Sequence, residues 1–566
     1  MASAQQSLGT QHEQTSGVTL VLSADIEHIG DKDAEVDKPA SSAASDGDTA
    51  DAGAPVAKTT NIEFALILLG LAMAVFLASL DQTIVSVAIP AVAQEFKSLD
   101  EIAWIGTAFF LTSTAFIPTY GKLADIFGRK PVFLLAVFVF EIGSIMCGAS
   151  TSMKMLIVSR AVAGLGGGGI FSLAIIIISD LVPLKDRAKY QGLIGACFGL
   201  ASVAGPLLGG LFTDKLSWRW NFYINGPVGA ITIVVSLFIL KLPHTGGDWR
   251  ASFARVDFLG TAVLVAGVIT FLIPIQGGGT LYEWNSPTVI SLFIVGAVLL
   301  IAFVLIELRV AKEPIMPLEL FTKRYALSAF ASAFFLGMSF FGAIFYTPVY
   351  FQVVNGDTAT QAGINTIPLI MGMVVFSISA GVIASSTGHY MPLVTLGGIL
   401  ITIGLGLMST LGAASTTGMK IGYLIITGAG LGFGFQSIVI ASQASVEESY
   451  LAVVTSISNF WQTIGAVFGL AITSSVFNNK LKTLLAELAT PTFDPLPLAG
   501  DPTLIRNRQF VPTAELQAQV IDAYVKALSQ IFIVSIPFAA MLVVMSLFVK
   551  RTRLSEELRK APAVAG

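Results

Sequence analysis

The segment Gly121-Lys-Leu-Ala-Asp-Ile-Phe-Gly-Arg-Lys130 combines glycine and charge in a chain that is otherwise poor in charge. By itself, such a composition fits an ordinary surface turn. Here it lies between two apolar stretches, each long enough to cross a bilayer as a helix of about 20 residues. The segment therefore indicates a short loop that joins two membrane helices.

The composition of the whole chain supports a membrane protein. The chain has 566 residues, of which 54% are hydrophobic and 12% charged, and its mean hydropathy is +0.78. Soluble domains carry about a quarter charged residues. The net charge of −4 gives no reason to expect a nucleic-acid partner. Cys147 and Cys197 lie far apart in apolar runs, so we predict no disulfide, metal site or cofactor.

The apolar runs predict fourteen membrane spans, which must be helices because a backbone in lipid has to satisfy its own hydrogen bonds. We expect an all-α polytopic membrane protein. The spans begin near Ile62, Ile102, Pro131, Met155, Tyr190, Asn221, Val256, Pro287, Ala326, Ala362, Met391, Met419, Ala452 and Leu528.

The distribution of Lys and Arg predicts the orientation. If the N-terminus is cytoplasmic, most basic residues lie in inner loops and in the C-terminal tail, as the positive-inside rule requires. The short outer loops then hold only Lys97, Lys154, Lys215, Arg219 and Lys420. Residues 1–60 are polar and acidic and are expected to form a disordered cytoplasmic tail.

A weak internal repeat divides the chain. Gly121 and Gly128 recur as Gly381 and Gly388 at the same spacing, but the second copy lacks the charges. Repeated halves are common in secondary transporters. We therefore predict the following segments: a six-helix bundle at 61–245, a linker helix pair at 246–312, a second six-helix bundle at 313–550 with an outer loop at 478–527, and a cytoplasmic tail at 551–566.

The charged segment resembles a signature of the major facilitator superfamily, and within it the fourteen-span drug:proton antiporters. The matching positions are Gly121, Leu123, Asp125, Gly128, Arg129 and Lys130. The resemblance implies the major facilitator fold, with two six-helix bundles and two extra linker helices. It also implies that Gly121, Asp125, Gly128, Arg129 and Lys130 form a gating loop at the inner face.

Three ionisable residues lie inside predicted spans. Asp81 belongs to Leu80-Asp-Gln-Thr-Ile-Val85, which resembles the first-span motif of the fourteen-span group, and Arg160 resembles the arginine of a fourth-span motif. Helical geometry puts both at a similar depth. They form either a permanent ion pair that fixes helix packing or a proton-coupling switch. Glu141 lies near mid-membrane and is either structural or a second proton site. No histidine lies in a span, so carboxylates must carry any proton coupling.

A glycine-rich row resembles the fifth-span motif that is associated with antiporters. It comprises Gly192, Gly205, Pro206, Gly209 and Gly210, with Ala201 where the family pattern has glycine. Glycines in membrane helices permit close helix approach. The resemblance favours export over uptake.

The second half has no charged residue at mid-membrane, so we expect it to contribute much of the substrate cavity. Its polar candidates are Tyr346, Tyr350, Gln436, Gln443, Asn459 and Gln462.

These patterns predict a transporter and not an enzyme. The leading hypothesis is proton-coupled efflux of small, largely apolar organic compounds, such as a toxin, secondary metabolite or drug, by a monomer in the plasma membrane or, alternatively, the vacuolar membrane. The expected partners are a small-molecule substrate, protons and the lipid bilayer. Two alternatives remain: an importer or facilitator of siderophores or basic amino acids on the same fold, and a membrane receptor that moves nothing. The absence of a P-loop motif argues against an ATP-driven pump.

Overall fold

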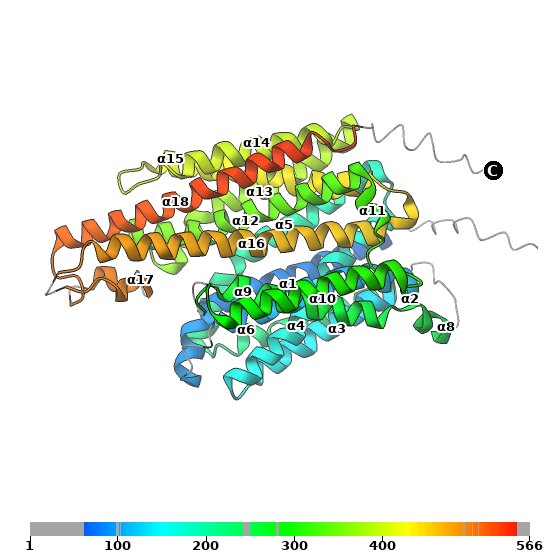
Figure 1. Ribbon diagram of the computed structural model, residues 1–566, viewed down its shortest axis with the longest axis horizontal. Coiled ribbons are helices and arrows are strands. Elements are labelled where there is room, and N and C mark those ends of the chain that lie inside the picture. Colours follow the sequence, from blue (N-terminus) through cyan, green and yellow to red (C-terminus); the bar gives the residue numbers. More distant parts are fainter. Residues whose placement is uncertain are drawn as a thin grey trace, which may run out of the picture. The chain divides into compact units, whose positions relative to one another are not determined.

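A computed structural model describes residues 61–97, 101, 103–240, 249–278, 282–490, 493–500, 502–507 and 509–551. The predicted tail at 1–60 lies outside these residues, as does the predicted tail at 551–566 except for Arg551. Long helices dominate the described part of the chain, and their axes run roughly parallel to one another (Figure 1).

We call residues 61–239 the first half, and it comprises seven helices among the described residues. They are α1 (Asn61–Phe96), α2 (Ala103–Phe127), α3 (Arg129–Gly148), α4 (Met153–Leu181), α5 (Leu184–Lys215), α6 (Trp220–Tyr223) and α7 (Asn225–Ile239). Helix α4 packs against α2 and α3, and α1 packs against α5 and α7.

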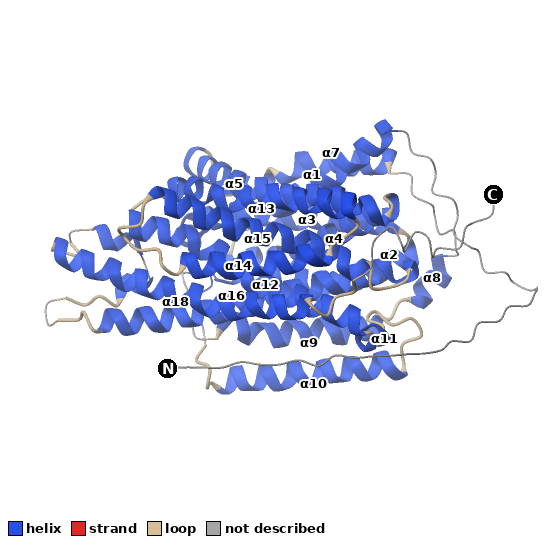
Figure 2. Cartoon of the chain, turned by 90° about the horizontal axis from the view of Figure 1, so that it is seen from above, coloured by secondary structure: helices blue, strands red, loops and turns tan. Residues whose placement is uncertain are grey.

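A helical hairpin follows the first half. It consists of the short α8 (Trp249–Arg255) and the long α9 (Phe258–Gly277) and α10 (Pro287–Arg309). The side chain of Asp257 caps α9 by accepting from Gly260 N, and Ser286 caps α10 in the same way. Helix α9 packs against α10, α2 and α16, whereas α10 lies at the edge of the helices (Figure 2).

We call residues 319–546 the second half, and it begins with α11 (Glu319–Thr322). The remaining elements are α12 (Arg324–Tyr350), the π-helix η2 (Phe351–Asn355), α13 (Ala359–Thr387), α14 (Met391–Met408), α15 (Thr417–Gln443), η3 (Glu448–Tyr450), α16 (Leu451–Ala486), α17 (Pro497–Gly500), η4 (Pro502–Arg506) and α18 (Ala514–Ser546). One buried apolar cluster is built wholly from this half, and another lies almost wholly in the first half.

Thirteen helices among the described residues are long and apolar enough to cross a membrane. Helix α2 is not among them, although it has 25 residues and packs along α4 and α16. Its threonines, serine and proline lower its hydropathy, and its polar side chains are turned inward, for example Thr112 toward Ala161 O at 2.8 Å. With α2 included, the number of spans agrees with the fourteen that the sequence predicts.

Two local expectations differ from the structure. The charged segment is not a loop, because α2 continues through Gly121 to Phe127 and only Gly128 interrupts the helical path. Gly128 has φ 88° and Gly388 has φ 73°, a region that side chains with a Cβ rarely adopt. The repeat thus preserves a glycine at each of these breaks. The outer segment is also shorter than 478–527, because α16 extends to Ala486 and α18 begins at Ala514.

Candidate functional site

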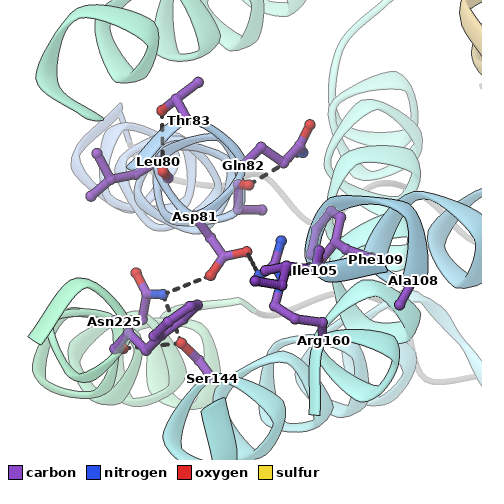
Figure 3. A network of polar contacts seen from close by, with 12 residues as sticks. Leu80, Asp81, Gln82, Thr83, Ile105, Ala108, Phe109, Ser144, Arg160 and Asn225 are labelled. Atoms are coloured by element: carbon purple, nitrogen blue, oxygen red, sulfur yellow. Dashed lines mark hydrogen bonds and ion pairs between the residues drawn. The ribbon is translucent and has the colours of Figure 1, made fainter. Parts of the chain in front are cut away.

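A buried ion pair joins α1 to α4. Arg160 Nη1 lies 2.5 Å from Asp81 Oδ2, and the side chains are 2% and 0% exposed. Figure 3 shows Asp81 between Arg160 and Asn225. The structure therefore brings together the two residues that the sequence placed at a similar depth.

Both members of the pair have further partners. Arg160 Nε donates to Ile105 O at 3.0 Å, and its guanidinium lies 4.5 Å from the Phe109 ring centroid. Asn225 Nδ2 reaches Asp81 Oδ1 at 3.4 Å and donates to Ser144 Oγ at 2.8 Å. The charges are thus held by a shell of neutral groups from α2, α3 and α7, as charges away from water require.

Sequence reasoning missed Asn225 and Ser144 as members of this network. Asn225 opens α7, and Ser144 lies within α3. A polar side chain within or at the start of an apolar span was the available signal. The signal was weak, because serine in a helix usually bonds its own backbone, whereas Ser144 donates to Phe222 O on α6 at 3.0 Å.

Glu141 on α3 lies apart from these hydrogen bonds. It is 6% exposed, and neither carboxyl oxygen has a hydrogen-bond partner among the described residues. Its carboxyl group contacts Gly229 of α7, where a Cβ would collide with Oε1. Burying an ionised carboxylate without a partner is costly.

The charged segment makes a compact set of polar contacts. Arg129 lies 2.7 Å from both Asp125 Oδ1 and Asp180 Oδ2. Lys130 Nζ donates to Leu237 O at 2.7 Å. These contacts join α2, α3, α4 and α7 within the first half.

Two contacts extend from α2 beyond the first half. Gly121 faces Ser456 of α16, where a Cβ would collide with the hydroxyl group. Lys122 Nζ lies 3.0 Å from Glu313 Oε2, in the segment that precedes α11.

The fifth-span glycines serve two different helix contacts. A Cβ at Gly192 would lie 3.3 Å from Ser377 O of α13, in the second half. Gly205 and Gly209 instead face Thr83 and Ile84 of α1. Pro206 and Gly210 belong to the same stretch of α5. The glycines of this row therefore let α5 pack closely against α1 of the first half. They also let α5 pack closely against α13 of the second half.

A cavity lies between the two halves, with an empty volume of about 1300 Å³ that includes open solvent. The described residues that line it include no Asp, Glu, Lys, Arg or His. Apolar and aromatic side chains dominate, and five amides supply most of the polar groups. The aromatic residues are Phe109, Phe110, Phe171, Phe198, Phe340, Phe341 and Phe435, and the amides are Gln82, Gln191, Gln436, Asn459 and Gln462.

Three of the six substrate-cavity candidates line this cavity, namely Gln436, Asn459 and Gln462. Tyr346 and Tyr350 are buried elsewhere, where they donate to Ser474 Oγ at 2.8 Å and Gly412 O at 3.0 Å.

Gln443, the remaining candidate, donates to Ser179 Oγ at 2.8 Å. Sequence reasoning missed the contribution of the first half, which supplies Gln82, Gln191 and four of the phenylalanines.

Four hydrogen bonds join the halves where α4 ends and α5 begins, which is the predicted cytoplasmic end. The pairs are Gln436 Nε2 to Gln191 Oε1 (3.3 Å), Gln443 Nε2 to Ser179 Oγ (2.8 Å), Ser172 with Ser456 (2.9 Å) and Ser385 Oγ to Asp186 Oδ1 (2.9 Å). This end of the cavity is therefore closed.

The defining sequence pattern of the Major Facilitator Superfamily matches residues 71–470. The chain belongs to this superfamily. That assignment agrees with the two-half arrangement of long helices around a central cavity, and it confirms the resemblance seen in the charged segment.

Characterised relatives cover most of the chain. An MFS-type efflux pump, MFS1, of Arthroderma benhamiae is 40% identical over 86% of this chain and 91% of its own length. The efflux pump aflT of Aspergillus parasiticus is 39% identical over 83% and 92%. An aspyridones efflux protein of Neocamarosporium betae is 36% identical over 90% and 91%.

Solved structures of the same fold include the human organic anion transporter MFSD10. It has a TM-score of 0.53 and 16% identity, covering 85% of this chain and 100% of its own. A bacterial homologue of the human lysosomal transporter Spinster also gives a TM-score of 0.53 at 16% identity, covering 87% and 98%. At this identity, these structures support the fold alone.

Proposed function

We propose that this transporter exports small, uncharged or weakly charged, largely apolar organic compounds in exchange for protons. The observation that carries the proposal is the cavity between the halves, whose described lining is aromatic and amide-rich and contains no ionisable side chain. Such a surface binds apolar rings and fixes their orientation with few hydrogen bonds. It offers no counter-ion to a basic amino acid, which argues against that import alternative.

The proposed proton site is Asp81. It is fully buried next to Arg160 on α4, and its neighbour in sequence, Gln82, lines the cavity. A change in the protonation of Asp81 alters its attraction to Arg160 and so alters the packing of α1 against α4. Because α1 also borders the cavity, this coupling connects proton binding to the shape of the cargo site. The alternative is a permanent ion pair that only fixes the packing of α1 against α4.

The direction of transport rests on relatives at 36–40% identity, two of which are named efflux pumps and one an efflux protein. They favour export over the importer and receptor alternatives. We further propose that the protein acts as a monomer in the plasma membrane, with the vacuolar membrane as the alternative. The two-bundle division at 61–245 and 313–550, with the linker pair at 246–312, remains our interpretation of its domains.

A transport assay tests the proposal. Purified protein in proteoliposomes should move a fluorescent apolar aromatic compound only when a pH gradient of the correct sign is imposed. An uncoupler should abolish this movement, and Asp81→Asn should abolish it without unfolding the protein. Gradient-independent equilibration would identify a facilitator, and tight binding without movement would identify a receptor.

A further inference from the structure

The wall of the cavity contains an amide nitrogen with no hydrogen-bond partner among the described residues. Asn459 on α16 lines the cavity, and its Nδ2 is buried with no hydrogen-bond partner among the described residues. An unmade buried hydrogen bond is costly. A donor left in this state at a cavity wall is available to an acceptor atom of a bound ligand.

Two other amides of the cavity wall are bonded to each other across the halves. Gln436 Nε2 of α15 donates to Gln191 Oε1 of α5 at the long distance of 3.3 Å. Both residues line the cavity, so cargo can reach them. This bond therefore joins the two halves and also forms part of the cargo site.

The bond continues into a chain of neutral hydrogen bonds that leads away from the cavity. Gln191 Nε2 donates to Ser179 Oγ at 3.0 Å, and Gln443 Nε2 donates to the same hydroxyl at 2.8 Å. Ser179 Oγ in turn donates to Ile175 O at 2.8 Å, so its one donor and both acceptor positions are used. Gln443 Nε2 also donates to Thr455 Oγ1 at 3.1 Å. The chain crosses between the halves twice.

We propose that these amides form a carbonyl-binding subsite for uncharged, planar aromatic cargo, and that cargo oxygen competes with Gln191 Oε1 for the one Gln436 N–H that joins the two amides. Asn459 supplies a second donor. The phenylalanines of the cavity wall contact the rings, because aromatic pairs favour edge-to-face and offset arrangements. The proposal rests on the exporter function above and adds the class of cargo and its polar contacts.

Competition at Gln436 gives the site a different affinity in each state. When the halves separate at the cytoplasmic end, Gln436 loses Gln191 and is free to bind cargo. When they close, Gln191 Oε1 again accepts from this N–H, and the cargo loses the one hydrogen bond that used it. A ligand shifts a conformational equilibrium only through such a difference in affinity. Cargo is therefore bound more tightly from the inside and released more readily after closure.

The test compares two ligands on one locked protein. The probes are 9,10-anthraquinone and anthracene, which share three fused rings and differ by two carbonyl oxygens. The cytoplasmic end is locked by oxidising Asp186→Cys/Ser385→Cys, where the native contact is 2.9 Å, in a background with Cys147→Ser and Cys197→Ser. Ser172→Cys/Ser456→Cys is a second locking pair. Binding is measured in nanodiscs by fluorescence quenching.

Anthraquinone should bind about five-fold more weakly to the oxidised form than to the reduced form, as expected for one neutral hydrogen bond. Anthracene should bind both forms equally. Gln191→Leu should remove the penalty by freeing Gln436 in the closed form, and Gln436→Leu should make anthraquinone behave like anthracene. Gln361→Leu is the matched control, because Gln361 is exposed on α13 and does not line the cavity. Its side chain donates to Asn365 Oδ1, and its backbone N–H donates to Thr358 Oγ1.

Equal anthraquinone affinity in both forms, or the same state dependence for anthracene, would overturn the proposal. Failure of both cysteine pairs to cross-link would contradict the closed end on which it depends. Binding requires no proton gradient, so loss of coupled transport with the binding pattern intact would refute the proposed antiport alone.

Discussion

The most informative perturbation is Asp81→Asn, because it removes one charge from a fully desolvated pair. The guanidinium of Arg160 would keep Ile105 O and the Phe109 ring but lose its only described carboxylate. Breaking a buried ion pair from one side costs about 3–5 kcal/mol, since the remaining charge is uncompensated. We expect a loss of that size in the free energy of unfolding, and a similar loss for Arg160→Met.

The double variant Asp81→Asn/Arg160→Met separates the structural role of the pair from its role in transport. Replacing both charges with neutral groups of similar volume is often close to neutral in stability. We expect the double variant to recover most of the stability that each single variant loses. We do not expect it to recover coupling, because it has no titratable group at this position. Urea or detergent-titration unfolding in mixed micelles measures stability, and cargo-driven proton flux in proteoliposomes measures coupling.

An exposed pair provides the control. Lys526 Nζ lies 2.7 Å from Asp522 Oδ2 on α18, and the side chains are 60% and 59% exposed. Asp522→Asn should leave the free energy of unfolding nearly unchanged, because exposed pairs are screened by water. If Asp81→Asn costs as little as this control, the argument from desolvation is wrong. If the double variant still moves protons with cargo, Asp81 is not the proton site.

Three further predictions concern packing, acidity and the backbone. Gly229→Ala should lower the melting temperature, because the new Cβ would collide with Glu141. Adding Glu141→Ala should restore the melting temperature. An unchanged melting temperature for Gly229→Ala alone would contradict this contact. Arg255 forms an ion pair with Glu313. The Arg255 side chain, together with Lys122, holds the pKa of Glu313 below its usual value of 4.5. The ionised Glu313 therefore stabilises the folded state above about pH 4.5, and this contribution is lost as the pH falls through the folded pKa. Glu313→Gln should therefore make thermal stability less sensitive to acidification over that range, and an unchanged pH profile would count against the ion pair. Gly128→Ala should cost about 1–3 kcal/mol of unfolding free energy, because φ is 88° there, whereas Ala124→Gly in the preceding helix should cost only about 1 kcal/mol.

Hydropathy predicted most of the fold because each membrane helix satisfies its own backbone hydrogen bonds. Spans were predicted to begin near Pro287 and Met391, and α10 and α14 begin at these residues. The last span was predicted near Leu528, whereas α18 begins at Ala514. The charged segment was predicted as a loop, since glycine and charge usually mark turns. In the structure, ion pairs from Arg129 to Asp125 and Asp180 satisfy these charges, and the helix continues to Phe127.

The pairing of Asp81 with Arg160 was foreseeable because both are costly in lipid and lie at similar depth. Asn225, Ser144 and Gln191 were not foreseen, since a neutral polar residue in an apolar helix either bonds its own backbone or reaches another helix. Only the packing of helices distinguishes these cases. Tyr346 was predicted to line the cavity, but its hydroxyl donates to Ser474 away from the cavity.

The sequence alone determined that this chain is a polytopic helical transporter, because the length of each apolar run can be read from a short stretch of residues. It also identified the buried charges, because an ionisable residue inside an apolar run is costly in lipid and therefore stands out. Only the tertiary structure decided which amides face the cavity and which close its end. Gln436 and Gln443 lie about two helical turns apart on α15. The first lines the cavity, whereas the second is not among the lining residues and donates to Ser179. Their roles differ because α4 and α5 of the other half supply different partners at each level.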